Sequence, residues 1–292
     1  MTRRTPGLVA RVATAVAVVV ITAACGTSEP GPIPGPTAAA PPSHVRQGHP
    51  AHRGVPVVGP ACDAATGRVE HVTFEASSFA ERGDFQLYLP PCYDTETTRR
   101  YPVLYLLHGG SQDDDHWSQL GLPGAADAAI AAHSIAPMIV VMPDGGPMFA
   151  PKNRTAFEHY LVHELVPRVD RTWRTSPERS GRAVGGISIG GRLALEAATD
   201  HPQLFSVVGA HSSTVRDVPG LARRLADGDL RIYLDVGNLD ALRGVDQSLA
   251  DALDRDGAHY EFHVSPGAHG RVYWSAHVRD YLRFYDAALA SC

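Results

Sequence analysis

The chain of 292 residues has no excess of positive charge. Its 26 lysines and arginines are outnumbered by 31 acidic residues, so the formal net charge is −5. The sequence also lacks a clustered basic stretch, and this excludes nucleic-acid binding as the main function. Charged residues make up 20% of the chain and hydrophobic residues 44%, which excludes an intrinsically disordered protein. The composition therefore predicts a globular protein.

The sequence also lacks a hydrophobic run long enough to cross a membrane. The longest apolar run, Leu8–Ile21, falls short of the roughly 20 residues that a span needs. Arg3 and Arg4 precede this run and small residues follow it, a pattern typical of a secretory signal peptide over residues 1–24. Thr22-Ala23-Ala24-Cys25 also resembles a bacterial lipobox, although Thr22 replaces the usual aliphatic residue. We therefore predict export, with either a lipid anchor on Cys25 at the outer face of the cell membrane or free secretion.

Cysteine is rare, and only Cys62, Cys92 and Cys292 follow Cys25. Three cysteines allow three single pairings, each of which leaves one thiol over. We favour the pair Cys62–Cys92 because these two residues flank a predicted β-hairpin, and an exported protein can keep a disulfide. None of the three lies in a nucleophile context, which disfavours a cysteine-based mechanism.

Residues 25–60 are dense in proline, glycine and alanine and show no hydrophobic period, so we predict a linker. Its histidines, His44, His49 and His52, are loosely spaced, and we expect them to be solvated rather than to bind a metal. The folded domain is expected over residues 61–292.

Within this domain, two alternating segments come first and continuous apolar segments follow, separated by amphipathic stretches. The predicted strands are Val69–Phe74, Phe85–Leu89, Val103–Leu107, Met138–Met142, Arg182–Ile187, Phe205–Ala210, Ile232–Val236 and Tyr260–Val264. The predicted helices are Phe157–Trp173, Leu193–Ala198, Gly244–Leu253 and Val272–Leu289. Apolar strands that alternate with helices predict a mostly parallel sheet covered on both faces. An antiparallel hairpin that leads into such a sheet is the layout of an α/β hydrolase.

Gly186-Ile187-Ser188-Ile189-Gly190 is a G-x-S-x-G motif between a predicted strand and a predicted helix. A serine at such a junction occupies a sharp turn that projects its hydroxyl, which predicts Ser188 as a nucleophile. The alternative is that Ser188 caps an ordinary helix. In this arrangement the oxyanion donors are the N–H groups of Ile189 and of the loop after the first parallel strand, where Gly110 lies. We expect the neighbouring His108 to be structural.

A triad on this fold runs in the order serine, acid, histidine. Two acids follow the strand Ile232–Val236 or lie in it, and we prefer Asp240, in the loop beyond the strand, to Asp235, inside it. His269 is the predicted base because it lies in a glycine-rich loop between the last strand and the last helix. The other histidines in this part, which lie at or within a predicted strand or helix, are His259, His263 and His277.

These residues resemble the esterase branch of the α/β hydrolases, which holds esterase D (S-formylglutathione hydrolase), feruloyl and acetyl-xylan esterases, enterochelin esterases and mycolyltransferases. The resemblance covers the whole folded domain. Its motifs are Tyr88-Leu89-Pro90-Pro91, Leu106-Leu107-His108-Gly109-Gly110, Val141-Met142-Pro143-Asp144-Gly145-Gly146, Gly186-Ile187-Ser188-Ile189-Gly190-Gly191 and Gly267-Ala268-His269. Two positions depart from the pattern: Ile189 replaces a common methionine, and Gly270 replaces an acid or serine. The resemblance implies no large cap domain and no metal or organic cofactor.

The predicted function is hydrolysis of a small-molecule or cell-envelope carboxylic ester outside the cytoplasm, through an acyl-enzyme on Ser188. Acyl transfer of the mycolyltransferase type uses the same triad and stays an alternative, and so does a non-catalytic surface protein that retains the fold. Trp117, Trp274 and Phe149 are candidates to line the substrate site, or are ordinary packing residues. In the run Asp113-Asp114-Asp115, we expect Asp113 to bond local backbone and the other two to be exposed.

Overall fold

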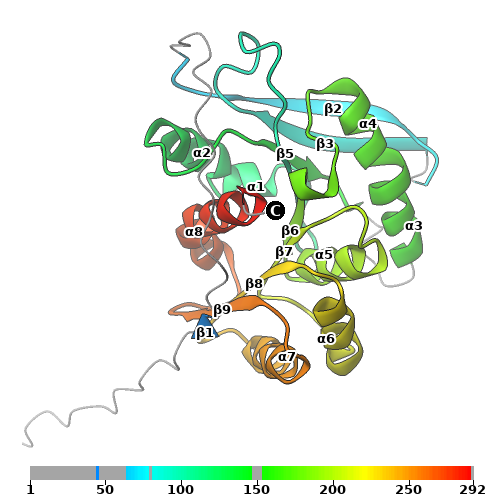
Figure 1. The fold of residues 1–292 in the computed structure, drawn as a ribbon, viewed down its shortest axis with the longest axis vertical. Coiled ribbons are helices and arrows are strands. Elements are labelled where there is room, and N and C mark those ends of the chain that lie inside the picture. Colours follow the sequence, from blue (N-terminus) through cyan, green and yellow to red (C-terminus); the bar gives the residue numbers. More distant parts are fainter. Residues whose placement is uncertain (1–43, 46–63, 79–80, 147–152, 291–292) are drawn as a thin grey trace, which may run out of the picture. The chain divides into compact units, whose positions relative to one another are not determined.

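A computed structural model describes residues 44–45, 64–78, 81–146 and 153–290 (Figure 1). Several predictions of the sequence analysis lie outside these residues: the signal peptide 1–24, the lipidation of Cys25, most of the linker 25–60, and Phe149. Within the linker, His44–Val45 form a short strand, β1. Cys92 is disulfide-bonded, but the other cysteines lie outside the described residues, so the pairing Cys62–Cys92 stays a prediction.

The described strands form a nine-stranded sheet in the order β1-β9-β8-β7-β6-β4-β5-β3-β2. The strands after β1 are β2 (Arg68–Ala76), β3 (Glu81–Leu89), β4 (Val103–Leu107), β5 (Ile139–Pro143), β6 (Arg182–Ile187), β7 (Val207–His211), β8 (Arg231–Gly237) and β9 (Tyr260–Ser265). Strands β4 to β9 are parallel, while the hairpin β2–β3 and the short β1 pair antiparallel at the two ends. The predicted α/β-hydrolase architecture is confirmed.

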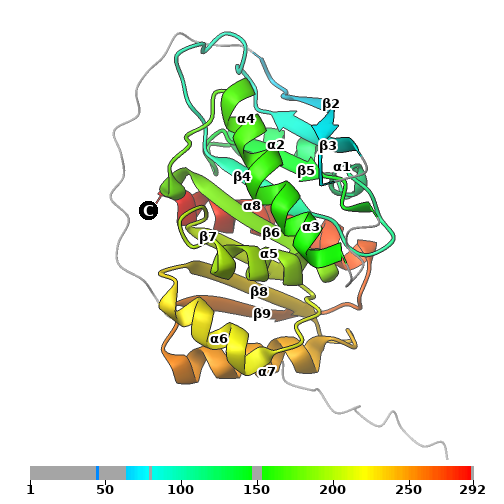
Figure 2. The same ribbon diagram turned by 90° about the vertical axis from the view of Figure 1, so that its right-hand side faces the viewer.

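Helices cover both faces of the sheet. They are α1 (His116–Gln119), α2 (Leu122–Ala131), α3 (Arg154–His159), α4 (Val166–Thr172), α5 (Ile189–Asp200), α6 (Val218–Asp227), α7 (Arg243–Asp256) and α8 (Arg271–Ala290). Figure 1 shows α1, α2 and α8 on one face, and Figure 2 shows α3 to α7 in front of the other. The sequence analysis did not predict α1, α2 and α6. No helix among the residues described here is both long and apolar enough to span a membrane.

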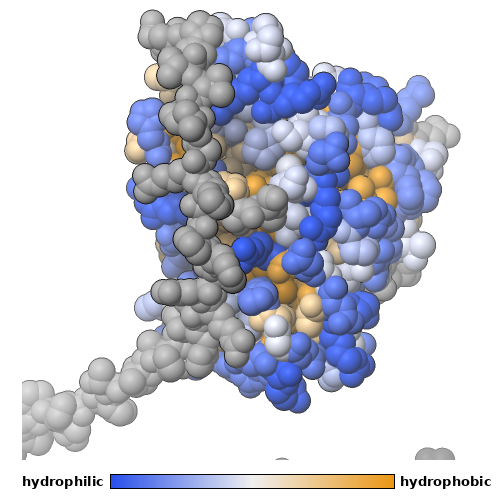
Figure 3. Space-filling model, viewed as in Figure 1, coloured by the Kyte–Doolittle hydropathy of each residue, from blue (hydrophilic) through white to orange (hydrophobic). Residues whose placement is uncertain are grey.

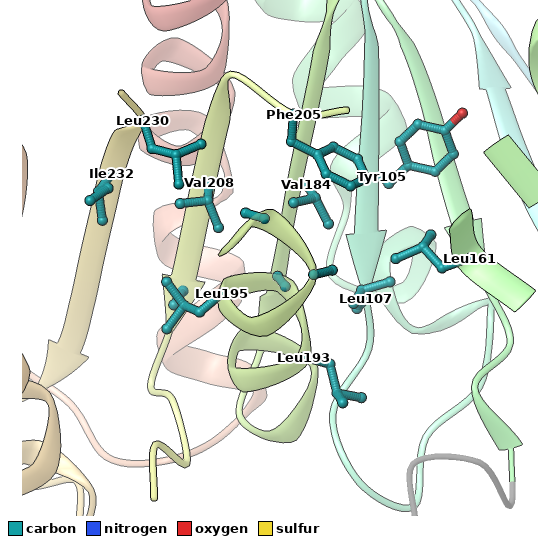
Figure 4. Packing of buried hydrophobic residues seen from close by; sticks show 14 of the residues in the cluster. Tyr105, Leu107, Leu161, Val184, Leu193, Leu195, Phe205, Val208, Leu230 and Ile232 are labelled. Atoms are coloured by element: carbon teal, nitrogen blue, oxygen red, sulfur yellow. The ribbon is translucent and has the colours of Figure 1, made fainter. Parts of the chain in front are cut away.

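The parallel strands are buried on both faces because successive side chains point to opposite sides. In β4, Tyr105 and Leu107 belong to the core beneath α5 and α6, whereas Leu104 and Leu106 belong to the core beneath α8. Figure 4 shows the first of these cores, with side chains of α5 packed against the central strands. This two-sided burial makes the strands rigid supports for the loops at their ends.

The predicted helix Phe157–Trp173 is interrupted by a π-helical turn, η3 (Tyr160–Leu165), between α3 and α4. Pro167 follows directly at the start of α4 and has no N–H to donate to the preceding turn. The wider turn removes the clash between the proline ring and that turn. The prediction of one regular helix was wrong here, although Leu161 and Val169 are buried as the apolar stripe required.

Candidate active site

Four loops that carry predicted site residues leave the same edge of the sheet. Because β4, β6, β8 and β9 are parallel, their carboxyl ends lie together. Gly110 follows β4, Ser188 follows β6, Asp240 follows β8, and His269 follows β9. The topology therefore brings together residues that are far apart in sequence.

Ser188 has backbone angles of φ 57° and ψ −115°, which few residues other than glycine adopt. Its backbone N–H donates to the carbonyl oxygen of His211 at 2.8 Å, which ties the turn to the end of β7. Its side chain makes no capping hydrogen bond to α5. The capping alternative is therefore wrong, and the hydroxyl is free for another role.

The turn requires glycine on both sides of Ser188. A Cβ on Gly186 would lie 2.5 Å from the carbonyl carbon of Gly190, and a Cβ on Gly190 would lie 2.3 Å from the carbonyl oxygen of His108. Both contacts are with backbone, which cannot move aside without a shift of the strand. The two glycines of the motif therefore let β4, β6 and the start of α5 approach closely enough to hold the turn.

His269 lies between Ser188 and Asp240. Its Nδ1 is 2.9 Å from Oδ2 of Asp240, and its Nε2 is 3.2 Å from Oγ of Ser188. A carboxylate can only accept, so Nδ1 carries the proton and Nε2 presents its lone pair to the serine hydroxyl. The Asp240 side chain is fully buried, whereas that of His269 is 35% exposed. Ser188, His269 and Asp240 are thus joined in a hydrogen-bonded series, in which the imidazole can take a proton from the serine hydroxyl.

The second acid considered, Asp235, has other partners. It is 1% exposed and accepts hydrogen bonds from the hydroxyls of Tyr273 and Tyr281 at 2.8 and 2.9 Å. Its other oxygen pairs with Nδ1 of His211 at 2.6 Å. Asp235 therefore joins α8 to the sheet. Only Asp240 lies next to His269, as the sequence analysis preferred.

The two predicted oxyanion donors come close to each other. A Cβ on Gly110 would have Cγ2 of Ile189 as its nearest neighbour, at 3.9 Å. Neither backbone N–H has a hydrogen-bond partner among the residues that the structure describes. Ile189 is the first residue of α5, where helix N–H groups lack partners within the helix. Both N–H groups can therefore donate to an external oxygen.

His108 fixes the loop that carries Gly110. Its Nδ1 donates to the carbonyl oxygen of Gly109 at 2.7 Å, and its Nε2 accepts from the N–H of Gly145 at 2.8 Å. The side chain is 2% exposed. The structural role predicted for His108 is confirmed, since it joins the loop after β4 to the loop after β5.

The sequence analysis missed Asn238, which joins the acid loop to the base loop. Its Oδ1 accepts from the N–H of Gly267 at 3.0 Å, and the N–H of Leu239 donates to the carbonyl oxygen of Gly267 at 2.8 Å. Gly267 has a φ of +146° and would place a Cβ 2.7 Å from Tyr273. Asn238 lies two residues before Asp240. The sequence gave no sign of its role, because its partner Gly267 lies in the separate loop that carries His269.

Of the two roles considered for Trp117, ordinary packing is the one that the structure shows, because its side chain is 1% exposed and packs edge-on against His211. Trp274 is also buried, at 3%, so it does not line an open site. Its ring meets His269 edge-on with centroids 5.0 Å apart, and its Nε1 donates to Oγ of Ser212 at 3.3 Å. Trp274 therefore supports the base instead of contacting substrate.

His116 lies behind Trp274, with ring centroids 6.1 Å apart. It is 4% exposed, and its Nε2 has no hydrogen-bond partner among the described residues. Burial, followed by the nearby His108 and Arg271, lowers the pKa of His116 to about 4. His116 is therefore neutral at neutral pH, and it gives Trp274, the residue that supports the base, an uncharged neighbour.

The acidic run near Gly110 matches the expectation for Asp113 but not for Asp114. The side chain of Asp113 hydrogen-bonds to the backbone of Asp115, as expected, and also to its side chain. The side-chain bond raises the pKa of Asp113 and lowers that of Asp115. Asp114 was expected to be exposed, but its side chain is only 13% exposed and pairs with Nε2 of His71 at 3.1 Å. The run therefore bonds to local backbone at Asp113, whereas Asp114 is withdrawn from solvent by its pairing with His71.

The fold and the site define an α/β hydrolase with a serine, histidine and aspartate in hydrogen-bonded series. Residues 76–285 match the family model described as "Putative esterase". The chain therefore belongs to this esterase family.

Named relatives agree with the family. The chain is 30% identical over 229 residues to an endo-1,4-beta-xylanase/feruloyl esterase of Xylanibacter ruminicola, a match that covers 73% of this chain and 30% of that protein. It is 33% identical over 155 residues to an esterase of Mycobacterium tuberculosis, with 50% of this chain and 32% of that protein covered. The chain thus spans about a third of the length of these curated relatives.

Solved structures share the fold. A ferulic acid esterase superposes with a TM-score of 0.69 at 22% identity, covering 76% of this chain and 98% of that one. An S-formylglutathione hydrolase of Staphylococcus aureus superposes with a TM-score of 0.63 at 17% identity, covering 77% of this chain and 98% of that one.

Proposed function

We propose that the chain is a serine carboxylic-ester hydrolase that works through an acyl-enzyme on Ser188. The observation that carries this proposal is the position of His269, which lies within hydrogen-bond distance of both Ser188 and Asp240. Membership in the esterase family supports the reaction class.

In the first half-reaction, Oγ of Ser188 attacks the ester carbonyl carbon and its proton passes to Nε2 of His269. The ester C–O bond then breaks, and His269 returns the proton to the leaving alcohol. In the second half-reaction, a water molecule attacks the carbonyl carbon of the acyl-serine and gives a proton to His269. The bond between the acyl carbon and Oγ then breaks, His269 returns the proton to Oγ of Ser188, and the acid is released. Asp240 holds His269 in the required tautomer and stabilises the imidazolium.

In this proposal the backbone N–H groups of Gly110 and Ile189 donate hydrogen bonds to the oxyanion of the tetrahedral intermediate. Both lie on rigid supports, since Ile189 begins α5 and His108 fixes the loop before Gly110. Preorganised donors of this kind lower the barrier by about 3 to 4 kcal/mol each. No metal is needed for this step, and the proposal includes none.

The proposed site of action is outside the cytoplasm. The signal-peptide pattern of residues 1–24 supports export, and the lipobox-like sequence at Cys25 supports an anchor on the cell membrane. The Pro- and Gly-rich residues 25–60 would then tether the esterase domain to the anchor. The substrate is accordingly a small-molecule or cell-envelope ester.

The proposal is tested with purified protein and a panel of p-nitrophenyl esters of increasing acyl length, together with methyl ferulate because similar proteins are named for that ester. The parent, Ser188→Ala, Asp240→Asn and Asp235→Asn are compared. We expect Ser188→Ala to lose about 10³-fold or more in kcat, and Asp240→Asn to lose activity while it keeps its thermal stability. Asp235→Asn should lose stability instead, because Asp235 is buried with three partners.

Equal activity of the parent and Ser188→Ala would contradict the proposal. Labelling by a fluorophosphonate probe provides a second readout, because it requires an activated serine but no particular ester. Labelling at Ser188 with no ester hydrolysis, followed by product formation when an acceptor alcohol is added, would indicate the acyltransferase alternative. A parent that is neither labelled nor active would indicate the non-catalytic alternative.

A further inference from the structure

Large hydrophobic side chains are seldom exposed in the part of the chain that the structure describes. Three are: Val69 at 40%, Leu239 at 76% and Val272 at 88%. Figure 3 shows that hydrophilic residues predominate on the face that it presents. Single exposed apolar residues are ordinary, but the two most exposed ones here lie next to the acid and the base in the sequence. Leu239 directly precedes Asp240, and Val272 follows His269 by three residues.

Leu239 and Val272 are both held against the loop that carries His269. The N–H of Leu239 donates to the carbonyl oxygen of Gly267, two residues before the base. Val272 lies in the first turn of α8, and its neighbour Tyr273 donates to the carbonyl oxygen of Gly270. The backbones of both residues therefore lie on the base side of the site, after β8 and β9, and both side chains are exposed to solvent.

The donors for the oxyanion lie elsewhere. Gly110 follows β4, and Ile189 follows β6. The carbonyl oxygen of a bound ester points toward these donors, whereas the oxygen of its alcohol must lie within reach of Nε2 of His269, because His269 returns a proton to it. The alcohol part of the ester therefore leaves the reaction centre on the side where Leu239 and Val272 lie.

We propose that Leu239 and Val272 form the contact site for the alcohol part of the substrate, and that the chain prefers esters of apolar alcohols. The inference rests on the proposed function, since it requires the reaction of Ser188 with His269 as the base. An apolar alcohol chain or aryl ring covers side chains that are otherwise exposed to water, and this contact stabilises the transition state before the alcohol leaves.

The test uses two ester series, measured by acid release at concentrations below micelle formation, and the longest esters are measured again above it. The first series keeps an acetyl group and changes the alcohol from methanol to butanol, octanol and naphthol. The second keeps ethanol and lengthens the acyl group. The proteins are the full chain, a double variant Leu239→Ser with Val272→Ser, and the control Val69→Ser, whose site on β2 lies at the opposite end of the sheet.

We expect the double variant to lose about ten-fold in kcat/KM for octyl and naphthyl acetate and less than two-fold for methyl acetate. The kcat/KM values of the double variant along the acyl series should match those of the parent. Val69→Ser should match the parent in both series. Both changed residues are exposed, so unfolding temperatures should stay near the parent value.

A loss that follows acyl length instead of alcohol size would overturn the proposal and place the residues on the acyl side. A loss seen only above micelle formation would overturn it in favour of contact with a lipid surface. Unchanged profiles in both series would exclude a substrate contact. If the parent hydrolyses no ester and Ser188 does not react with the fluorophosphonate probe, the proposed function itself is wrong. If the parent is active but the double variant shows no selective loss, only the proposal for the alcohol contact is wrong.

Discussion

The backbone N–H of Leu239 donates to the carbonyl oxygen of Gly267 at 2.8 Å, and this bond joins the loop of the acid to the loop of the base. The carboxamide of Asn238 adds a second bond to the same residue. Because Asp240 and His269 lie within three residues of this junction, their relative position depends on it. The junction offers a way to disturb the geometry of the triad without touching its members.

Replacement of Asn238 tests this dependence. Asn238→Ala removes the acceptor for the N–H of Gly267, and we expect kcat/KM to fall about ten-fold because small displacements of a catalytic group are costly. Asn238→Asp keeps an oxygen at the same place and should restore most of the activity. Steady-state kinetics with one p-nitrophenyl ester measures both. A residue that only stabilised the fold would lower the unfolding temperature of Asn238→Ala and leave the kcat of the folded enzyme unchanged.

The strained turn at Ser188 predicts a gain in stability when the nucleophile is lost. Ser188→Gly relieves the cost of a side chain at φ 57°, whereas Ser188→Ala keeps it. We expect Ser188→Gly to be about 1 kcal/mol more stable than Ser188→Ala, and both to be inactive. Since the serine side chain caps nothing in α5, Ser188→Ala should match the parent in urea unfolding. A large loss of stability in Ser188→Ala would show that the hydroxyl supports the turn.

Much of the fold was predictable because its strands are buried on both faces. The segments Val103–Leu107 and Arg182–Ile187 were predicted with the bounds that the structure has. The π-helical turn and α6 escaped prediction for different reasons. The π turn depends on how Pro167 meets the preceding turn, which periodicity does not reveal. α6 had a readable start, since the side chain of Asp217 accepts from the N–H of Gly220, and its buried residues Leu221, Ala222 and Leu225 follow helical spacing. The sequence analysis missed it although this signal was present.

The catalytic residues could be predicted because each needs a particular residue type in a particular loop. Chain order and loop position led to Ser188, Asp240 and His269 because the topology places strand ends together. The tryptophans were not predictable in this way. Whether Trp117 faces substrate or core depends on the direction of a short helix, α1, that the pattern did not show.

The close approach of β4 to the nucleophile turn predicts a penalty for any side chain at Gly190. In Gly190→Ala, the new Cβ would meet the carbonyl oxygens of His108 and Leu107 at 2.3 and 2.7 Å. We expect a loss of about 3 kcal/mol in the free energy of unfolding and loss of activity, because β4 carries the oxyanion loop. Gly244→Ala is the matched control, since a Cβ there meets nothing within 4 Å. That change in α7 should stabilise by about 0.5–1 kcal/mol, and equal effects of the two changes would contradict the packing argument.

The buried His116 predicts a pH dependence of stability. Its pKa is about 4 in the folded chain and near 6.5 when exposed. Between these values the unfolded chain binds a proton that the folded chain does not, so the free energy of unfolding falls as pH drops from about 6.5 to about 4. We expect His116 to account for about 2 kcal/mol of this fall. Urea unfolding at several pH values should show a flatter curve for His116→Leu, with unchanged slope above pH 7.

The control for this experiment is His259→Leu, because His259 is exposed at the start of β9 and is not part of the core. Its curve should keep the acid-side fall of the parent. If the free energy of unfolding of His116→Leu falls in acid as steeply as that of the parent, the fall arises from other groups. The assignment of a buried, uncharged His116 beside Trp274 would then be wrong. A flatter curve with the activity of the folded enzyme retained would show that an apolar side chain can take the place of the uncharged imidazole beside Trp274.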